Sequence, residues 1–161
     1  ALDLLGAEGL DGVRVERLAR RLKITKGSFY HHFKDRDDLY AAMLEHWSRR
    51  LVIEVIEELE RIPEPKARFR QVMRTPYAVD TADRDVELAI MLWARRDPRA
   101  AAALQEADRL RADFIGRAIT ACGAPPAEAH ARGVLALAFL RAAPSLDPEG
   151  FAACERLLLS G

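Results

Sequence analysis

The 161-residue sequence has few residues of the kinds that build disulfide frameworks, metal centres or membrane spans. Its two cysteines, Cys122 and Cys154, are far apart and show no paired spacing, so we expect two reduced, mostly buried thiols. No run of about 18 consecutive apolar residues is present, and we expect no transmembrane helix and no membrane partner. The N-terminal residues lack the basic and then apolar order of a secretory signal, which favours a cytoplasmic location.

Sequence patterns typical of catalytic sites are also missing. The run from Lys26 to Ser28 lacks the leading glycine of a phosphate-binding loop. Ser28 does not follow a predicted strand, as the nucleophile of a strand-turn-helix elbow would. The adjacent His31 and His32 would point apart on a helix, and their surroundings do not have the spacing of a metal-binding motif. We therefore expect no enzymatic activity, no metal and no cofactor.

The formal net charge is zero, because 25 basic residues balance 25 acidic ones. The basic residues are nevertheless concentrated in one place. Between positions 15 and 34 the only acid is Glu16, and the basic residues are Arg17, Arg20, Arg21, Lys23, Lys26 and Lys34. Such a stretch suits a phosphate backbone, although by itself it is also typical of a solvated surface. The sequence begins at Ala1 and not at methionine, so we expect further residues upstream.

The sequence predicts helices throughout and no strands. Alanine, leucine, arginine and glutamate are abundant, and alternating apolar and polar runs are absent. Thr25 and Asp35 are suited to cap helices, because their side-chain oxygens accept free backbone amide protons. Gly6, Gly9 and Gly12 are expected to separate a first helix from the second. The expected helices after them are 15–22, 25–33, 35–60, 65–73, 83–95, 98–122, 126–143 and 148–159. The expected apolar stripe of the helix 35–60 is Leu39, Met43, Trp47, Leu51, Val55 and Leu59.

Three short helices followed by a long one, with a basic third helix, are typical of a helix-turn-helix. In that motif the second helix supports the third, which enters the major groove of DNA. Ala19 is small enough to let the two helices cross closely. The residues expected to form the core of the crossing are Leu18, Leu22, Ile24 and Phe29.

Two segments resemble the TetR family of regulators. Residues 9–19 read GLDGVRVERLA and residues 25–39 read TKGSFYHHFKDRDDL, and the second segment carries the more specific pattern. The resemblance implies an all-α fold with a helix-turn-helix DNA-binding domain at 1–46. A long helix joins it to an all-helical ligand-binding and dimerisation domain at 47–161. It also implies a homodimeric repressor whose partner is a palindromic operator of double-stranded DNA.

The resemblance also implies roles for individual residues. The positions that match phosphate contacts are Thr25, Ser28, Tyr30 and Lys34. The positions that match base-edge contacts are Lys26, Gly27 and His31. Arg14 stands where the family usually has a serine or threonine that caps the second helix. Because arginine cannot cap in that way, we expect Arg14 to contact a phosphate instead.

A ligand pocket inside the helical body is a further implication of the resemblance. Large aromatic residues with few polar groups suit a mostly apolar pocket, so the expected ligand is a small apolar or amphipathic molecule. The candidate ligand-binding residues are Trp47, Phe69, Met73, Tyr77, Trp93 and Phe114. The alternative is that each of them is an ordinary core residue.

The last two expected helices hold more apolar residues than one buried face requires. These residues are Val134, Leu135, Leu137, Ala138 and Leu140 on the first, and Phe151, Leu157, Leu158 and Leu159 on the second. Two such helices from each subunit would form a four-helix dimer interface with twofold symmetry. Alternatively, they pack only within their own chain. Two other functions stay open, a ligand-independent DNA-binding regulator and a helical partner-binding protein.

Overall fold

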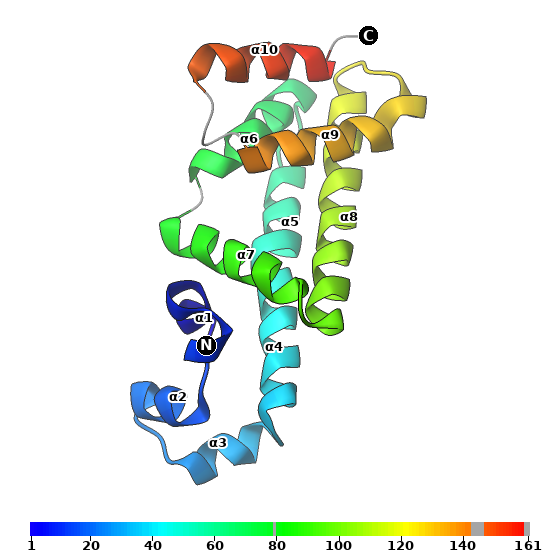
Figure 1. The fold of residues 1–161 in the computed structure, drawn as a ribbon. Helices are drawn as coiled ribbons and strands as arrows, with labels where there is room; N and C mark the ends of the chain where they lie inside the picture. The colour runs from blue at the N-terminus through cyan, green and yellow to red at the C-terminus, as the bar shows by residue number, and fades with distance from the viewer. Residues whose placement is uncertain (79, 143–146, 160–161) are drawn as a thin grey trace. The chain divides into compact units, whose positions relative to one another are not determined.

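The computed structural model describes residues 1–78, 80–142 and 147–159, apart from the side chains of Tyr77 and Ala78. All the regular secondary structure in these ranges is helical, and the fold is the predicted all-α fold with an N-terminal helix-turn-helix (Figure 1). In the described part of the chain, no helix is long and apolar enough to cross a membrane.

Packing divides the chain into two compact units. Unit 1 consists of Ala1–Leu51 and Asp80–Gln105, and unit 2 of Val52–Val79 and Glu106–Gly161. Residues 80–105 thus pack with the N-terminal helices, from which they are distant in sequence. The expected division of function between 1–46 and 47–161 stays a prediction, since these units are defined by packing alone.

Unit 1 contains the three short helices expected at the N-terminus. Its elements are α1 (Leu2–Glu8), α2 (Val15–Leu22), α3 (Lys26–His32), α4 (Arg36–Ser48), α7 (Thr81–Ala94) and the first part of α8 (Pro98–Ala121). Helix α1 packs against α7. Gly6 was expected to help separate the first helix from the second, but it lies inside α1. It permits the close approach, because a Cβ at Gly6 would lie only 3.1 Å from the backbone nitrogen of Val86. Gly9, with φ of 70°, ends the helix instead.

The helix predicted at 35–60 is not a continuous α-helix. It consists of α4, a π-helical turn (Arg49–Ile53) and α5 (Glu54–Glu60). A π-helical turn closes i to i+5 hydrogen bonds and so holds more residues than an α-helical turn. The apolar stripe shifts by one position there: after the buried Trp47 the next buried residue is Val52, and the predicted Leu51 is only half-buried. The stripe is buried again at Leu59.

Unit 2 is built from α5, α6 (Pro65–Ala78), the second part of α8, α9 (Ala129–Ala142) and α10 (Pro148–Leu159). Helix α6 extends past the predicted end at Met73. The buried core of the unit includes Phe69, Met73, Phe114, Ile119 and Leu140. Two glycines bring α8 and α9 together backbone to backbone. A Cβ at Gly133 would overlap the carbonyl oxygen of Ala112, and a Cβ at Gly116 would overlap that of Ala129.

Candidate nucleic-acid interface

A tight two-residue turn joins α2 to α3. The backbone N–H of Ile24 donates to the carbonyl of Ala19 at 2.9 Å, and that of Lys23 donates to Arg20 at 3.2 Å. These two hydrogen bonds form a Schellman motif, which requires a left-handed residue at its centre. Lys23 adopts that conformation, with φ 56° and ψ 38°. The expected helices 15–22 and 25–33 left only two residues for this turn, but the left-handed lysine in it was not predicted.

A side-chain cap then starts α3, as predicted. Thr25 has extended backbone angles, and its Oγ1 accepts a hydrogen bond from the Ser28 N–H at 3.0 Å. A hydroxyl has two lone pairs and one proton, so capping leaves the Thr25 O–H able to donate to another acceptor. Asp35 caps α4 in the same way, by accepting from the Asp38 N–H at 2.9 Å. Asp38 in turn accepts from the Lys34 N–H at 3.1 Å.

The core of the helix crossing is smaller than the sequence predicted. Leu18, Ala19 and Phe29 are buried, as expected. Leu22 is 62% exposed and Ile24 is 36% exposed, so their assignment to the core was wrong. Leu22 is the last residue of α2 and Ile24 lies in the turn, so both lie beyond the positions at which the two helices cross. Helical periodicity alone places Leu22 with Leu18, because the pattern does not show where neighbouring elements end.

Helix α3 has one buried residue and presents the rest of its surface to solvent. Phe29 is 3% exposed, and its ring contacts the rings of Tyr30 and Phe33 with centroid distances of 5.5 and 5.2 Å. The exposed residues of the helix are Lys26, Gly27, Ser28, Tyr30, His31 and His32. We call these six residues the α3 face. Phe29 therefore anchors the helix that carries the predicted DNA contacts of the α3 face.

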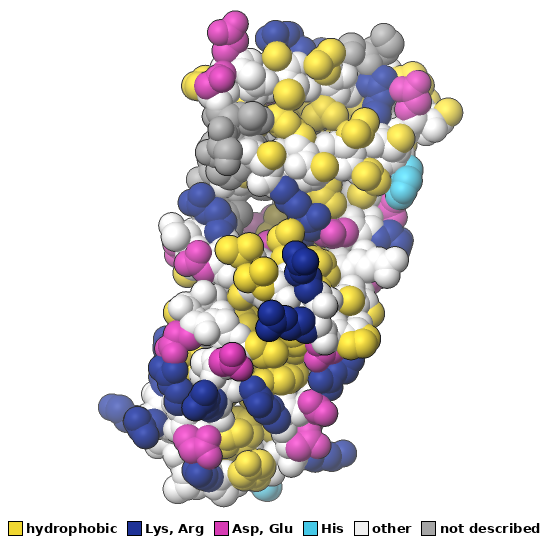
Figure 2. Space-filling view, in the orientation of Figure 1, with side chains coloured by type: hydrophobic (Ala, Val, Ile, Leu, Met, Phe, Trp, Pro, Cys, Tyr) yellow, Lys and Arg dark blue, Asp and Glu magenta, His cyan; other side chains and the backbone are white. Residues whose placement is uncertain are grey.

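Three ion pairs neutralise part of the positive charge of α2 and α3. The Lys26 Nζ lies 2.8 Å from the Glu16 Oε1, and this hydrogen bond raises the pKa of Lys26 and lowers that of Glu16. The two other pairs are Arg17 with Glu8 and Arg21 with Asp3. Figure 2 shows basic side chains over α2 and α3, with acidic ones among them. The surface is thus mixed in sign, and the unpaired cations determine where an anion is attracted.

Arg14 precedes α2 and does not cap it through its side chain. Its Nε donates to the carbonyl of Asp11 at 3.0 Å, and the residue is exposed. A guanidinium has five N–H donors, so most of them stay free for a second acceptor. Arg14, Thr25, the α3 face and Lys34 are all exposed in unit 1.

Residues 1–43 match the family model described as bacterial regulatory proteins, tetR family. Residues 1–43 therefore form an N-terminal DNA-binding domain of the TetR family type. The match covers α1, α2, α3 and the first part of α4. No curated protein matches the chain at a significant level. The chain is therefore a DNA-binding transcription regulator, and DNA is its partner.

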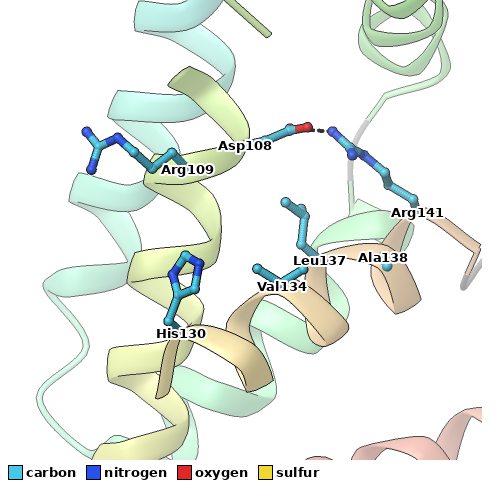
Figure 3. Close-up of a pocket in the computed structure, with 7 residues that line it drawn as sticks. All are labelled: Asp108, Arg109, His130, Val134, Leu137, Ala138 and Arg141. Atoms are coloured by element: carbon cyan, nitrogen blue, oxygen red, sulfur yellow. Dashed lines mark hydrogen bonds and ion pairs between the residues drawn. The ribbon is translucent and has the colours of Figure 1, made fainter. Parts of the chain in front are cut away.

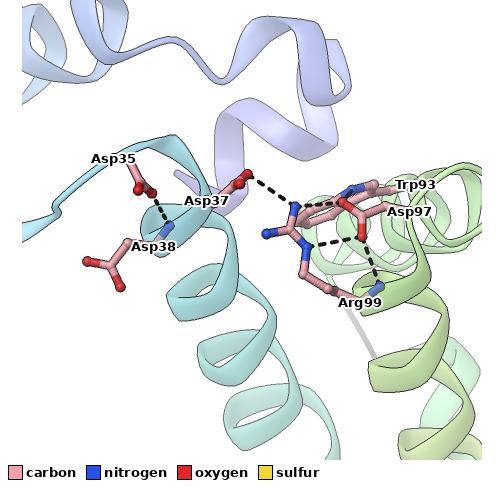
Figure 4. A network of polar contacts seen from close by, with 6 residues as sticks. All are labelled: Asp35, Asp37, Asp38, Trp93, Asp97 and Arg99. Atoms are coloured by element: carbon pink, nitrogen blue, oxygen red, sulfur yellow. Dashed lines mark hydrogen bonds and ion pairs between the residues drawn. The ribbon is translucent and has the colours of Figure 1, made fainter.

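A polar network ties the start of α4 to the corner between α7 and α8 (Figure 4). Arg99 lies 3.2 Å from Asp37, in the first turn of α4, and 3.0 Å from Asp97. Asp97 also accepts from the indole Nε1 of Trp93 at 3.2 Å. Mainly through the hydrogen bond from Arg99, the pKa of Asp97 is lowered to about 2. The network therefore links Trp93 to the residues that directly follow α3.

The predicted ligand-binding residues fall in both units of the chain. Trp47 and Trp93 lie in unit 1, where the Trp47 Nε1 donates to Glu87 at 3.1 Å and the Trp93 ring contacts Tyr40 at 5.0 Å. Residues of the set in the buried core of unit 2 are Phe69, Met73 and Phe114. The side chain of Tyr77 lies outside the described residues. The role of this set in ligand binding stays a prediction.

A hollow on the surface of unit 2 was not predicted from the sequence (Figure 3). Its lining residues are Asp108, Arg109, His130, Val134, Leu137, Ala138 and Arg141. Arg141 pairs with Asp108 across it, and the His130 Nδ1 lies 3.1 Å from Asp113. Three of the lining residues belong to the apolar set that the sequence assigned to a dimer interface. The charged members were missed, because nothing in their spacing shows that α8 and α9 pack together.

Cys122 and Cys154 are both free and half-buried. Burial raises the pKa of the Cys122 thiol, so this residue is mostly protonated at neutral pH. Among the described residues no group of three or more His, Cys, Asp or Glu side chains is placed to hold a metal ion.

Proposed function

We propose that the chain is a homodimeric repressor that a small apolar or amphipathic molecule releases from a palindromic operator. DNA binding follows from the N-terminal domain. The observation that most supports the mode of binding is the α3 face, whose polar side chains are exposed on a helix held by a single buried ring. We also propose a cytoplasmic location and no enzymatic activity.

Within that proposal, the α3 face reads DNA in the major groove. Lys26, Gly27 and His31 face base edges, where a lysine donates to guanine acceptors and a glycine allows close approach of the backbone. The hydroxyls and cations that bind phosphate oxygens belong to Arg14, Thr25, Ser28, Tyr30 and Lys34. Phosphate contacts fix the register of the helix on DNA, while the base contacts determine which sequence is preferred.

Dimerisation is part of this mechanism, because one seven-residue helix contacts few base pairs. In helix-turn-helix dimers the two reading helices enter successive major grooves on one face of the DNA. Helix α9 supports an interface: Val134 and Leu135 are 46% and 64% exposed, while Ala136 and Leu140 on the same helix are buried in unit 2. Leu157 on α10 is 71% exposed. Covering these side chains would remove apolar surface from water.

Ligand response needs a connection between the helical body and α3. The Trp93–Asp97–Arg99–Asp37 network supplies one inside unit 1. We propose that a ligand bound in the helical body shifts α7 or α8, and that Arg99 transmits the shift to the start of α4. A ligand changes operator affinity only as far as it prefers one of the two arrangements.

A specific observation favours a ligand-independent regulator as the second candidate. Phe69, Met73 and Phe114 are at most 4% exposed and pack within one core cluster. Residues packed in this way act as ordinary core and need no ligand. In that case the same dimer would repress, and changes in protein concentration alone would regulate its targets.

Operator selection tests the proposal. Full-length protein would be used to select from random-sequence duplexes at a stated salt concentration. We expect one palindrome with half-sites about one helical turn, or a multiple, apart. Transcription in vitro from a promoter that contains this palindrome should fall as protein is added. Activation would contradict repression, a non-palindromic site would contradict the dimer, and failure to enrich any sequence would contradict specific reading.

A further inference from the structure

Lys23 has an unusual backbone conformation for its residue type. Among the residues that the structure describes, it is the only one other than glycine with positive φ. In this region the Cβ of an L-residue approaches the following carbonyl oxygen, and glycine avoids that strain. The α2–α3 turn requires the conformation, since the hydrogen bonds of both Lys23 and Ile24 depend on it. A lysine here therefore makes the turn less stable than a glycine would.

The strain is not offset by an ion pair of the lysine within the chain. Arg17, Arg21 and Lys26 are paired with acids, but Lys23 has no carboxylate partner in the described ranges, and its side chain is exposed. Residues held in strained conformations are concentrated at functional sites. The Lys23 ammonium group is therefore free for a partner outside the described residues.

The position of Lys23 indicates what that partner is. Lys23 lies two residues before the cap Thr25, and Lys34 lies two residues after His32, the last residue of α3. Exposed lysines thus precede and follow the seven-residue helix. A helix in the major groove has phosphate backbone on both sides of it, and lysine binds phosphate as a compact point charge.

We propose that Lys23 anchors the α2–α3 turn to a DNA phosphate and so holds α3 at the end opposite to Lys34. The proposal rests on the α3 face being the DNA-reading surface. A contact at each end fixes the tilt of α3 in the groove as well as its position. Because phosphates are the same in every sequence, this anchor strengthens binding to all duplexes alike. The lysine thus adds affinity for DNA, and the fold loses stability in exchange.

Three substitutions separate the strain from the charge. Lys23→Gly removes both, Lys23→Asn keeps a residue type that tolerates positive φ but removes the charge, and Lys23→Arg keeps the charge. Binding would be measured on the selected operator and on a random duplex at several salt concentrations. For the Gly and Asn variants we expect about three- to tenfold weaker binding on both duplexes. The salt slope should fall by about one per bound subunit, and Lys23→Arg should bind like the wild type.

Thermal unfolding supplies the second readout and shows that the variants are folded. Lys23→Gly should raise Tm by about 2–4 °C, because the strain at the turn is relieved. Lys66→Gln, which removes one positive charge from the start of α6, controls for net charge and should leave the salt slope unchanged.

The proposal is overturned if the Gly and Asn variants bind both duplexes with wild-type affinity and salt slope. It is also overturned if their losses are confined to the operator, since a phosphate contact cannot discriminate. Failure of the proposed function gives a different result, because the wild type would then prefer no sequence. The comparison of Lys23 variants on the random duplex would still show whether Lys23 binds a phosphate. A wild type that binds no duplex contradicts both.

Discussion

The residues of the α3 face lie close to an acid that opposes their charge. Glu16 pairs with Lys26 across the two helices of the motif, and both side chains are more than half exposed, at 56% and 59%. Exposed ion pairs add little to folding stability. Their effect on a polyanion is larger, because the acid cancels part of the positive charge that attracts it. Glu16 therefore limits the attraction of this surface for DNA in general.

The first prediction concerns Glu16→Gln, which keeps the size of the side chain and removes its charge. Without this acid the surface is more positive, so affinity for random duplexes should rise about two- to fivefold, with a steeper salt dependence. Discrimination between operator and random DNA should fall. Competition binding at two salt concentrations measures both quantities. Glu8→Gln is the matched control, because it removes the acid that pairs with Arg17. Equal effects of the two variants would refute the special role of Glu16.

At the scale of elements, features that depend on short-range contacts were predicted well, and features that depend on tertiary contacts were not. The caps at Thr25 and Asp35 were predictable because donor and acceptor lie three residues apart. The π-helical turn at Arg49–Ile53 was not, since residues 35–60 continue a helical pattern through it. The packing of α7 on α1 was equally invisible, because nothing local in either helix indicates its partner.

The second prediction concerns the corner between α7 and α8. The folded-state pKa of Asp97 is about 2, below its ordinary value of 3.8. The Asp97 carboxylate therefore adds stability above about pH 4, and this contribution is lost as the pH falls toward 2. In Asp97→Asn the loss of Tm between pH 4 and 2 should be smaller than in the wild type. Arg99→Gln removes the group that lowers the pKa of Asp97 and should have a similar effect.

Tryptophan fluorescence is the appropriate probe for this prediction. The sequence has two tryptophans, Trp47 and Trp93, and both lie in unit 1 with the network. Their emission therefore follows the unfolding of that unit. If the Tm of Asp97→Asn fell as steeply as that of the wild type over this pH range, the network would not be the source of the acid sensitivity.

At the scale of the whole molecule, the N-terminal third of the chain was predictable from the sequence and the helical body was not. The run from Thr25 to Leu39 combines a cap, a turn and a buried ring at fixed spacing, so it indicated the motif directly. The candidate ligand residues were chosen as large aromatics and a methionine, and this criterion does not separate a pocket from a core. Phe69 and Phe114 are indeed buried in the core cluster of unit 2.

The third prediction tests the dimer. Leu135 on α9 is 64% exposed in the single chain, so Leu135→Glu should leave Tm of the monomer nearly unchanged. A charge at the centre of an apolar interface should weaken dimerisation about thirtyfold or more. Sedimentation velocity over a range of concentrations measures this. The control is Leu88→Glu, because Leu88 on α7 is also exposed, at 56%. If both variants weakened dimerisation equally, the result would contradict an interface on α9.

The central claim is that two copies of α3 read successive major grooves, and guanine methylation protection on the selected operator tests it most directly. The guanine N7 atom lies in the major groove, so a reading helix shields it from methylation. We predict two protected patches on one face of the duplex, about one helical turn or a multiple apart. Lys26→Ala should weaken protection in both. A single patch, or specific binding without protection of any guanine in the half-sites, would contradict the account.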